Sequence, residues 1–233
     1  MRFSEYDYQE PEETGKCPAM DSIWDTHWDG RKVLKEDLSD EPLWPTIRHH
    51  LRVPGRLLEA GCGTGQLVQF LGKLGHDAVG VDYAASGLEV GRAANPNLNL
   101  IQADLRKLPF PDESFDYIVS FGAVEHAVEG PEAALRELLR VPTADGWLLC
   151  SVPCVNIYLR AALPWMVVKD WLRRRAVVRR MMGHREQFVF YQYLWTPAAY
   201  RRILRRVGFR LVELRRYGEG PSNPRLGCAC TAS

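Results

Sequence analysis

The sequence lacks the features that mark several common classes of protein. Its six cysteines show no paired C-x-x-C spacing, which excludes the usual zinc sites and a secreted disulfide framework. Its acidic start, MRFSEYDYQEPEETGK, has neither the basic nor the apolar region of a signal peptide. We therefore expect a cytoplasmic protein with reduced thiols, no metal site and a flexible segment at residues 1–20. Its 233 residues suit one decorated domain.

Long apolar runs are also missing, and charge is unevenly distributed. In the arginine-rich part of the chain the longest charge-free apolar stretch, Ala161–Val168, is far shorter than the roughly 20 residues of a transmembrane helix. Residues 1–154 carry 14 Lys and Arg against 25 Asp and Glu, whereas residues 155–216 carry 15 against 3. The basic part could contact nucleic acid, an anionic membrane or an acidic substrate, or it could attract the acidic part of the same chain.

The glycine-rich stretch LLEAGCGTGQL, residues 57–67, lacks the lysine of a phosphate-binding loop. Its G-x-G-x-G spacing also differs from the G-x-G-x-x-G of dinucleotide-binding turns. An apolar run before the glycines and an amphipathic segment after them predict a strand, a tight turn and a helix. Gly61, Gly63 and Gly65 can adopt positive φ and leave bare backbone facing a ligand, towards which the amides of the next helix point. The turn is predicted to hold a small molecule.

From Arg56 the sequence alternates strands with helices, as in a parallel sheet that is covered on both faces. The predicted strands are Arg56–Ala60, Ala78–Asp82, Leu98–Gln102, Phe115–Phe121, Gly146–Val152 and Arg210–Tyr217. Four helices are predicted. The first follows the glycine turn and ends near Leu74, and the second runs from a cap at Ser86 to about Ala94. The other two are Pro131–Val141 and Pro197–Val207. Leu226–Ala232 is a poor match for a seventh, antiparallel strand and is left open. The predicted fold class is α/β, with a Rossmann-like, mainly parallel sheet of about six or seven strands.

Acidic residues follow two of the predicted strands, at the edge where such sheets bind ligands. Asp82 comes 23 residues after Glu59, close to the separation of about 20 at which an acidic residue accepts hydrogen bonds from a ribose. Asp104 follows the third strand, where its carboxylate could accept from an adenine amino group while the Leu105 amide meets a ring nitrogen. Either carboxylate could also be merely solvated.

The E-x-G-x-G-x-G turn and the segment LPFPDESFDYIV together resemble class I S-adenosylmethionine-dependent methyltransferases, in the branch similar to ubiquinone and menaquinone biosynthesis enzymes. The resemblance covers Arg56–Val152 and Thr196–Tyr217. It implies S-adenosylmethionine as the cofactor. The resemblance also implies a role for each matching residue. Glu59 would lie near the methionine end of the cofactor, and Gly61, Gly63 and Gly65 would form its backbone cradle. Asp82 would bind the ribose, Tyr83 would lie along the adenine, and Asp104 and Leu105 would contact the adenine edge. Phe121, Gly122 and His126 would line the methyl-transfer face.

His126, in VSFGAVEHAVE, is the candidate catalytic residue. A histidine at this place could act as a general base on an acceptor hydroxyl, since imidazole titrates near neutrality. The Glu125–His126 pair also looks like a general feature of this branch across unrelated acceptors, which favours a structural or cofactor-side role. Both interpretations stay open.

Two further segments are expected to shape the acceptor site. Residues 21–52 predict two short helices that form a flap, with Trp24 and Trp28 as apolar walls, or that simply pack on the sheet through Leu43, Ile47 and Leu51. Within the main domain, residues 53–233, an insertion at residues 153–195 is predicted to form a helical lid broken at Pro164. Its aromatic residues are expected either to line the acceptor pocket or to belong to the core. These residues are Trp165, Trp171, Phe188, Tyr191 and Tyr193. The arginines at 173–175 and 179–180 either bind an anionic group or form a solvated face.

The predicted function is methyl transfer to oxygen or carbon of a small-molecule or lipid-like acceptor. Because SFGA stands where DNA amino-methyltransferases carry Asn/Asp-Pro-Pro-aromatic, methylation of DNA is not expected. Nucleic acid is an unlikely partner on this interpretation, and peripheral contact with an anionic membrane and the oligomeric state are left open. The alternatives are an RNA methyltransferase that uses the basic insertion and a non-catalytic binding module on the same fold.

Overall fold

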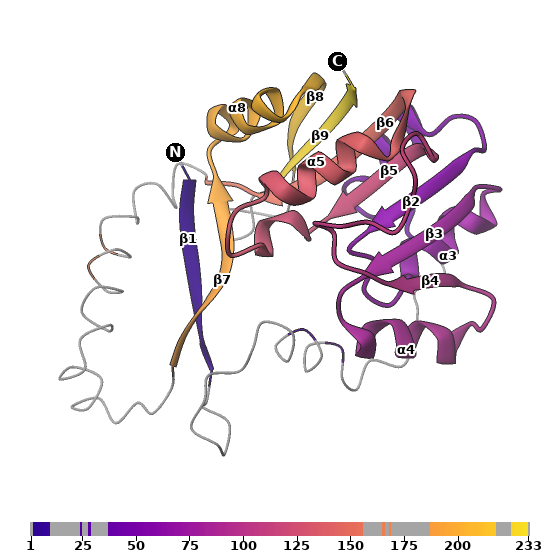
Figure 1. Cartoon of the computed structure of the whole chain (residues 1–233), viewed down its shortest axis with the longest axis horizontal. Helices are drawn as coiled ribbons and strands as arrows, with labels where there is room; N and C mark the ends of the chain where they lie inside the picture. The colour runs from indigo at the N-terminus through magenta and orange to yellow at the C-terminus, as the bar shows by residue number, and fades with distance from the viewer. Residues whose placement is uncertain are drawn as a thin grey trace.

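The computed structural model describes residues 2–9, 24, 28, 37–155, 165, 168, 187–217 and 225–232. Within them, seven strands form one sheet in the order β4-β3-β2-β5-β6-β9-β8 (Figure 1). The bounds of these strands are β2 Arg56–Ala60, β3 Asp77–Asp82, β4 Asn99–Gln102, β5 Phe115–Phe121, β6 Pro142–Pro153, β8 Phe209–Tyr217 and β9 Arg225–Ala232. The first five run parallel, and β9 is antiparallel to both β6 and β8. The predicted α/β fold class is confirmed.

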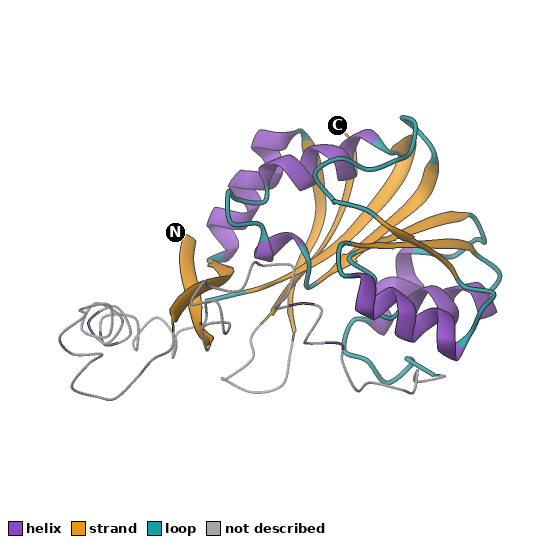
Figure 2. Cartoon of the chain, turned by 60° about the horizontal axis from the view of Figure 1, so that its bottom comes forward, coloured by secondary structure: helices purple, strands orange, loops and turns teal. Residues whose placement is uncertain are grey.

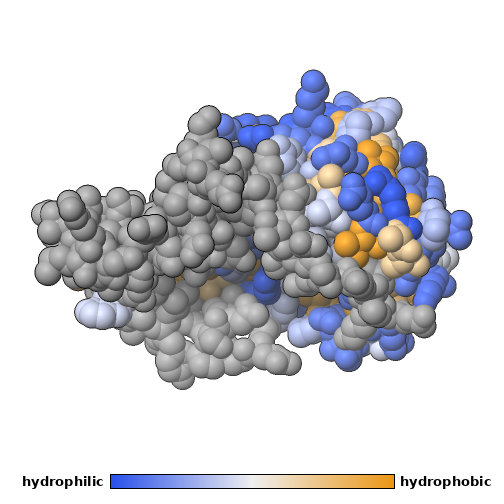
Figure 3. Space-filling view, turned by 90° about the horizontal axis from the view of Figure 1, so that it is seen from below, coloured by the Kyte–Doolittle hydropathy of each residue, from blue (hydrophilic) through white to orange (hydrophobic). Residues whose placement is uncertain are grey.

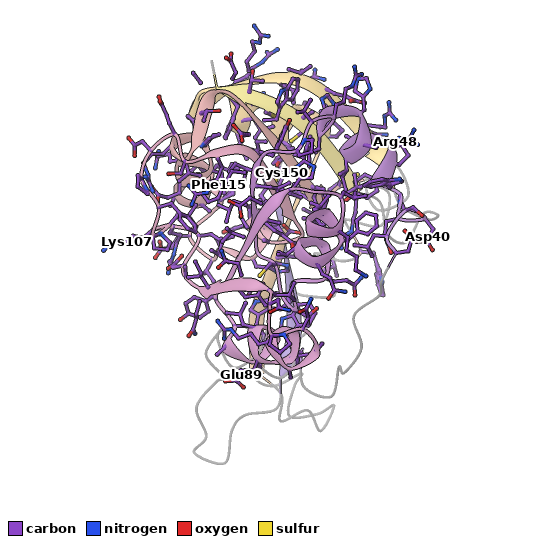
Figure 4. All side chains as sticks on the ribbon, turned by 90° about the vertical axis from the view of Figure 1, so that its right-hand side faces the viewer. Asp40, Arg48, Glu89, Lys107, Phe115 and Cys150 are labelled. Atoms are coloured by element: carbon purple, nitrogen blue, oxygen red, sulfur yellow. The ribbon has the colours of Figure 1, made fainter. Side chains whose placement is uncertain are left out.

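Helices cover both faces of this sheet (Figure 2). They are α2 Trp44–His50, α3 Gln66–Lys73, α4 Ala85–Ala94, the 3-10 turn η1 Val124–His126, α5 Glu132–Arg140 and α8 Pro197–Val207. Consecutive strand residues point to opposite faces, so Leu57 joins a core with α2 and α3 while Leu58 joins one with α5 and α8. Phe115 and Cys150 lie inside, whereas Lys107 and Glu89 project at the periphery (Figure 4). Burial on both faces explains why these strands read as continuous apolar runs.

Helix boundaries follow the predictions closely. Helix α8 matches its predicted range, because Thr196 caps it by accepting a hydrogen bond from the Ala199 amide at 3.3 Å and Gly208 ends it. The predicted Ser86 cap is wrong, since α4 begins at Ala85 and the extended Ala84 is its N-cap, which leaves Ser86 in the first turn.

The apolar stripe of the N-terminal region packs on the sheet. Ile47 and Leu51 are buried with α3, and Leu43 packs against them, which confirms the packing interpretation for this stripe. Of the predicted flap, residues 21–23, 25–27 and 29–36 lie outside the described residues, as does most of the predicted insertion.

The seventh strand, left open from the sequence, is present. β9 lies between β6 and β8, with Ala229 opposite Leu149 on one side and Glu213 on the other. Its residues Cys228, Ala229 and Cys230 are small and fully or almost fully buried. Small residues carry little strand propensity, so this strand depends on hydrogen-bonding partners on both sides rather than on its own side chains.

A second, two-stranded sheet corrects two predictions. β1, Arg2–Gln9, pairs antiparallel with β7, Gln187–Trp195, so the first residues form a strand where the sequence predicted flexibility. The end of the predicted helical lid is likewise a strand. The aromatic-rich segment QFVFYQYLW favours a strand, but the residues with which it pairs are 178 (Gln9 with Gln187) to 193 (Arg2 with Trp195) positions away along the chain.

In the part of the chain that the structure describes, no helix is both long and apolar enough to cross a membrane. Seen from below, the described surface mixes hydrophilic and apolar residues (Figure 3).

Replacing Ala229 by proline tests the central place of β9. Proline cannot donate to the strand ladder, so we expect the free energy of unfolding in urea to fall by about 3 kcal/mol or more. The matched control is Ala198→Pro, in the exposed first turn of α8, where proline is tolerated and the expected change is below about 1 kcal/mol. Equal effects of the two substitutions would contradict the placement of β9.

Candidate functional site

The glycine turn lies between β2 and α3 as predicted. Gly61, Gly63 and Gly65 have φ of 85°, 53° and 72°, a region that other residues rarely adopt. The amides of Gly61 and Cys62 donate to the Val81 carbonyl at 2.8 and 2.9 Å, which fastens the turn to β3. The backbone therefore requires glycine at all three positions.

Close packing gives a second reason for these glycines. A Cβ on Gly61 would collide with Ala123, which follows β5. One on Gly63 would stand 2.5 Å from the Trp28 ring, and one on Gly65 would stand 2.7 Å from Leu100 of β4. The turn is thus in contact with neighbouring strand ends and with Trp28.

Glu59, at the end of β2, is buried and accepts a hydrogen bond from the Val68 amide of α3 at 3.0 Å. Burial raises the pKa of its carboxyl well above the ordinary value. The side chain thus ties the strand to the helix, and it also borders the cavity described below.

Asp82, at the end of β3, holds the turn through both carboxylate oxygens. Oδ2 accepts from the Gly63 amide at 2.7 Å, and Oδ1 accepts from the Ala84 amide at 2.9 Å. These two hydrogen bonds hold the carboxylate beside the glycine turn. Its neighbour Tyr83 is 44% exposed, and the Tyr83 carbonyl accepts from Gln102 at 3.0 Å.

Asp104 lies beyond the end of β4, one strand further along the sheet. Its carboxylate accepts from the Arg106 guanidinium at 2.7 to 3.0 Å and from the Arg106 amide at 2.8 Å. Hydrogen bonds from Arg106 lower the pKa of this carboxyl, which stays ionised. Leu105 is half-buried, 3.9 Å from where a Cβ on Gly61 would stand, so the loop after β4 reaches the glycine turn.

The end of β5 supplies Phe121, Gly122 and η1. Gly122 has φ of 74° and Phe121 borders the cavity. His126 is half-buried, with its ring edge-on to Trp24 at 4.5 Å between centroids. Trp24 and Trp28 therefore both contact elements of the predicted site.

Glu125 has a more unusual environment than His126, which the sequence analysis named as the candidate catalytic residue. Its side chain is fully buried, and neither carboxylate oxygen has a hydrogen-bond partner among the described residues. Burial raises the pKa of this carboxyl to about 7, although its own backbone amide and, to a smaller extent, the positive charge of Arg225 oppose the shift. A buried acidic group without a partner is costly, and such groups concentrate at functional sites.

A cavity of about 420 Å³ opens beside Glu59 and Phe121. It is also bordered by Trp28 and by the polar residues Ser151, Tyr217 and Arg225. Burial raises the pKa of the Tyr217 phenol to about 12, so the hydroxyl keeps its proton.

Ser151, Tyr217 and Arg225 were missed from the sequence. Tyr217 ends β8 and pairs with Arg225, the first residue of β9. Treating Leu226–Ala232 as a strand would have placed Arg225 at the ligand-binding edge, since an antiparallel strand begins where its parallel neighbours end.

The aromatic residues that were predicted to line the acceptor pocket have different environments. Tyr193 is buried and its hydroxyl donates to the Val128 carbonyl at 2.6 Å, which makes it a core residue. Trp165 is 68% exposed. Trp171 and the side chains of Phe188 and Tyr191 lie outside the described part of the chain, as do the two arginine clusters.

Comparison with known proteins agrees with this geometry. Residues 58–150 match the family model described as a methyltransferase domain. The chain is 33% identical over 126 residues to a probable S-adenosylmethionine-dependent methyltransferase of Mycobacterium tuberculosis, which is 50% of this chain and 45% of that protein. It is 35% identical over 170 residues to a demethylmenaquinone methyltransferase of Clavibacter sepedonicus, which is 66% of this chain and 68% of that one.

Two further similar proteins carry other names. A probable tRNA methyltransferase 9B of Mus musculus is 30% identical over 149 residues, 62% of this chain and 32% of that protein. The structure of a Burkholderia thailandensis 1,6-didemethyltoxoflavin-N1-methyltransferase with bound S-adenosylhomocysteine has a TM-score of 0.64 at 16% identity, covering 98% of this chain and 96% of that one.

The chain therefore belongs to the S-adenosylmethionine-dependent methyltransferase family. It spans about half the length of several of the curated relatives that it matches.

Replacing Glu125 by glutamine should change how stability depends on pH. The folded protein holds a proton up to about pH 7 that an unfolded chain releases near pH 4.5, so the stability contributed by this group is present below pH 4.5 and is lost as the pH rises to 7. Glutamine does not titrate. We expect the variant to unfold in urea like the parent at pH 5 and to be more stable by up to about 3 kcal/mol at pH 8.

The control for this prediction is Glu89→Gln on α4, where the side chain is exposed. It should show the same difference from the parent at both pH values. A Glu125→Gln variant that behaves like this control would contradict the raised pKa.

Proposed function

We propose that this protein transfers a methyl group from S-adenosylmethionine to a small-molecule or lipid-like acceptor at oxygen or carbon. The observation that carries the proposal is the glycine turn, in which three glycines at positive φ present bare backbone and the Asp82 carboxylate fixes the central amide. Its family membership supports the same conclusion.

The residues at the strand ends fit this cofactor. In the proposal, Gly61, Gly63 and Gly65 cradle it with their backbone, which holds this turn only because glycine tolerates positive φ and lacks a Cβ that would collide with Ala123, Trp28 or Leu100. The Asp82 carboxylate would accept hydrogen bonds from the ribose hydroxyls, and Tyr83, which is exposed, would lie along the adenine. Asp104 with Leu105 would read the adenine edge, and Phe121 and Gly122 would border the reacting end. Glu59 acts through α3, to which it is hydrogen-bonded, rather than as a direct ligand.

S-adenosylmethionine supplies a sulfonium with an activated methyl group, so the protein chiefly has to bind and align the two reactants. Trp28 and the cavity walls would exclude water from the acceptor. His126 lies against Trp24, which supports a positioning role as much as that of a base.

Two alternatives are kept because particular observations favour them. The similarity to a probable tRNA methyltransferase favours RNA as the acceptor, and it predicts RNA binding that weakens steeply with salt. A non-catalytic module would bind neither S-adenosylmethionine nor S-adenosylhomocysteine in calorimetry. For the proposed activity, incubating the protein and S-adenosylmethionine with a cell extract should give small-molecule products heavier by one methylene in mass spectrometry.

Replacing Asp82 by asparagine tests the cofactor site. The amide is a weaker acceptor and turns an N–H group towards the backbone donors of Gly63 or Ala84. We expect the dissociation constant for S-adenosylhomocysteine, measured by calorimetry, to rise about 10- to 100-fold, as for the loss of a hydrogen bond to a charged group.

Asp77→Asn is the matched control. Asp77 is the first residue of β3, at the end of the strand away from Asp82, and its side chain is 72% exposed. Its affinity for S-adenosylhomocysteine should equal that of the parent. Unchanged affinity in the Asp82→Asn variant would remove Asp82 from the site.

A further inference from the structure

A cavity of about 800 Å³ opens at the end of the sheet away from the glycine turn. Pro54 and His76, which precede β2 and β3, border it together with residues of α2 and the end of α3. Its volume lies within the roughly 300–1,000 Å³ typical of sites for small molecules. Ile47 borders this cavity and the one beside Glu59, so the two cavities share one wall residue. The chain thus has room for a second small ligand.

Most of the cavity wall is apolar. Trp44 is edge-on to Phe70, with 5.1 Å between the ring centroids, and Leu74 is 47% exposed. A ligand that covered Leu74 would remove apolar surface from water, which favours a ligand with an apolar body. The apolar residues that border the cavity are Trp44, Pro45, Ile47, Leu51, Pro54, Leu71 and Leu74.

The ionisable side chains that border the cavity are all basic, and they are Arg48, His49, Arg52 and His76. No acidic residue borders it among the residues that the structure describes. Arg48, at the surface (Figure 4), and His49 belong to the last turn of α2, where the helix dipole favours positive charge. Arg52 and His76 lie outside α2, so the dipole does not account for them.

The hydrogen bonds of the two histidines decide which ring nitrogen can contact a ligand. His49 Nδ1 lies 3.0 Å from Arg52 Nη2, and because a guanidinium only donates, this nitrogen accepts. His76 Nδ1 likewise accepts from the Gly55 amide at 3.3 Å. The proton of each ring is therefore on Nε2, which donates.

Arg52 is held in a fixed orientation as well, since its Nε donates to the His49 carbonyl at 2.8 Å. The four basic side chains thus offer hydrogen-bond donors to the cavity, while the acceptor nitrogens of both histidines are already used. A ligand that matches this set carries an acceptor, and positive charge on the two arginines favours an anionic one.

We propose that this cavity binds a small amphipathic anion. Its anionic oxygen group accepts hydrogen bonds from Arg48 and Arg52, and its apolar body lies against Leu71 and Leu74. A neutral or cationic ligand of the same shape buries the same apolar surface but gains no charge-assisted hydrogen bond. The site is separate from methyl transfer and does not depend on the proposed function.

Three probes of matched shape test the site. Octanoate, octanol and octylammonium have the same alkyl chain and end in an anion, a neutral hydroxyl or a cation. We would titrate each into the full chain by calorimetry, at fixed ionic strength and below the concentration at which it forms micelles. We expect octanoate to bind at least about tenfold more tightly than octanol, and octylammonium to bind most weakly.

Two substitutions assign the preference to the named arginines. Arg48→Met and Arg52→Met each remove a guanidinium but keep an unbranched apolar side chain. Each should weaken octanoate binding at least about fivefold and leave octanol binding unchanged. The matched control is Arg136→Met, at an exposed position of α5 on the other face of the sheet, which should bind octanoate like the parent.

A third substitution tests the apolar wall. Leu74→Glu places a carboxylate at an exposed position that borders the cavity, so the fold should tolerate it, and circular dichroism checks this for every variant. Because like charges repel, octanoate affinity should fall at least about tenfold.

Arg225→Met separates this cavity from the one beside Glu59. Arg225 borders the latter and not the former, so this variant should bind octanoate like the parent. Loss of octanoate binding in Arg225→Met alone would overturn the proposal in favour of an anion site beside Glu59.

The remaining outcomes are equally decisive. Equal binding of octanoate and octanol, or octanoate binding that survives either Arg48→Met or Arg52→Met, would contradict the proposal. Binding of the protein to anionic phospholipid vesicles without binding of octanoate would replace it by a membrane surface. No binding of any probe would refute it and leave the cavity to solvent.

Discussion

The hydrogen bond from the Gly63 amide to the Asp82 carboxylate is the interaction on which the candidate site depends. It joins the carboxyl ends of β2 and β3 at 2.7 Å and fixes a turn whose glycines all have positive φ. The second Asp82 oxygen holds the amide of Ala84, just before α4. One side chain therefore fixes the loops that follow β2 and β3, and Glu59 ties β2 to α3.

The polar groups around this turn differ in whether they already have hydrogen-bond partners. The edge that we assign to the cofactor, from Asp82 to Asp104, is built from backbone amides and carboxylates that have partners within the protein. The other part, from Gly122 to Arg225, contains the buried Glu125, which has none among the described residues.

Much of the fold could be predicted from the sequence because each core strand carries its own signal. Apolar runs such as IVS in β5 and LLC in β6 are buried on both faces, and the glycine and acidic residues at their ends mark the ligand edge. The strands β1, β7 and β9 could not be predicted with the same security. Their stability comes from pairing with segments far away in the chain, and the small residues of β9 give no pattern that announces it.

The sequence by itself determined the class of protein and predicted the donor side. The reason is that Gly61, Gly63, Gly65, Asp82 and Asp104 all follow strands in a local pattern that repeats along the chain. Only the tertiary structure decided what lies beside Gly122. Glu125 and Arg225 are 100 residues apart, and an antiparallel strand inserted beside β6 brings them to the same glycine. Sequence spacing carries no record of such a contact, since it depends on how the last strand pairs and on what burial does to a carboxylate.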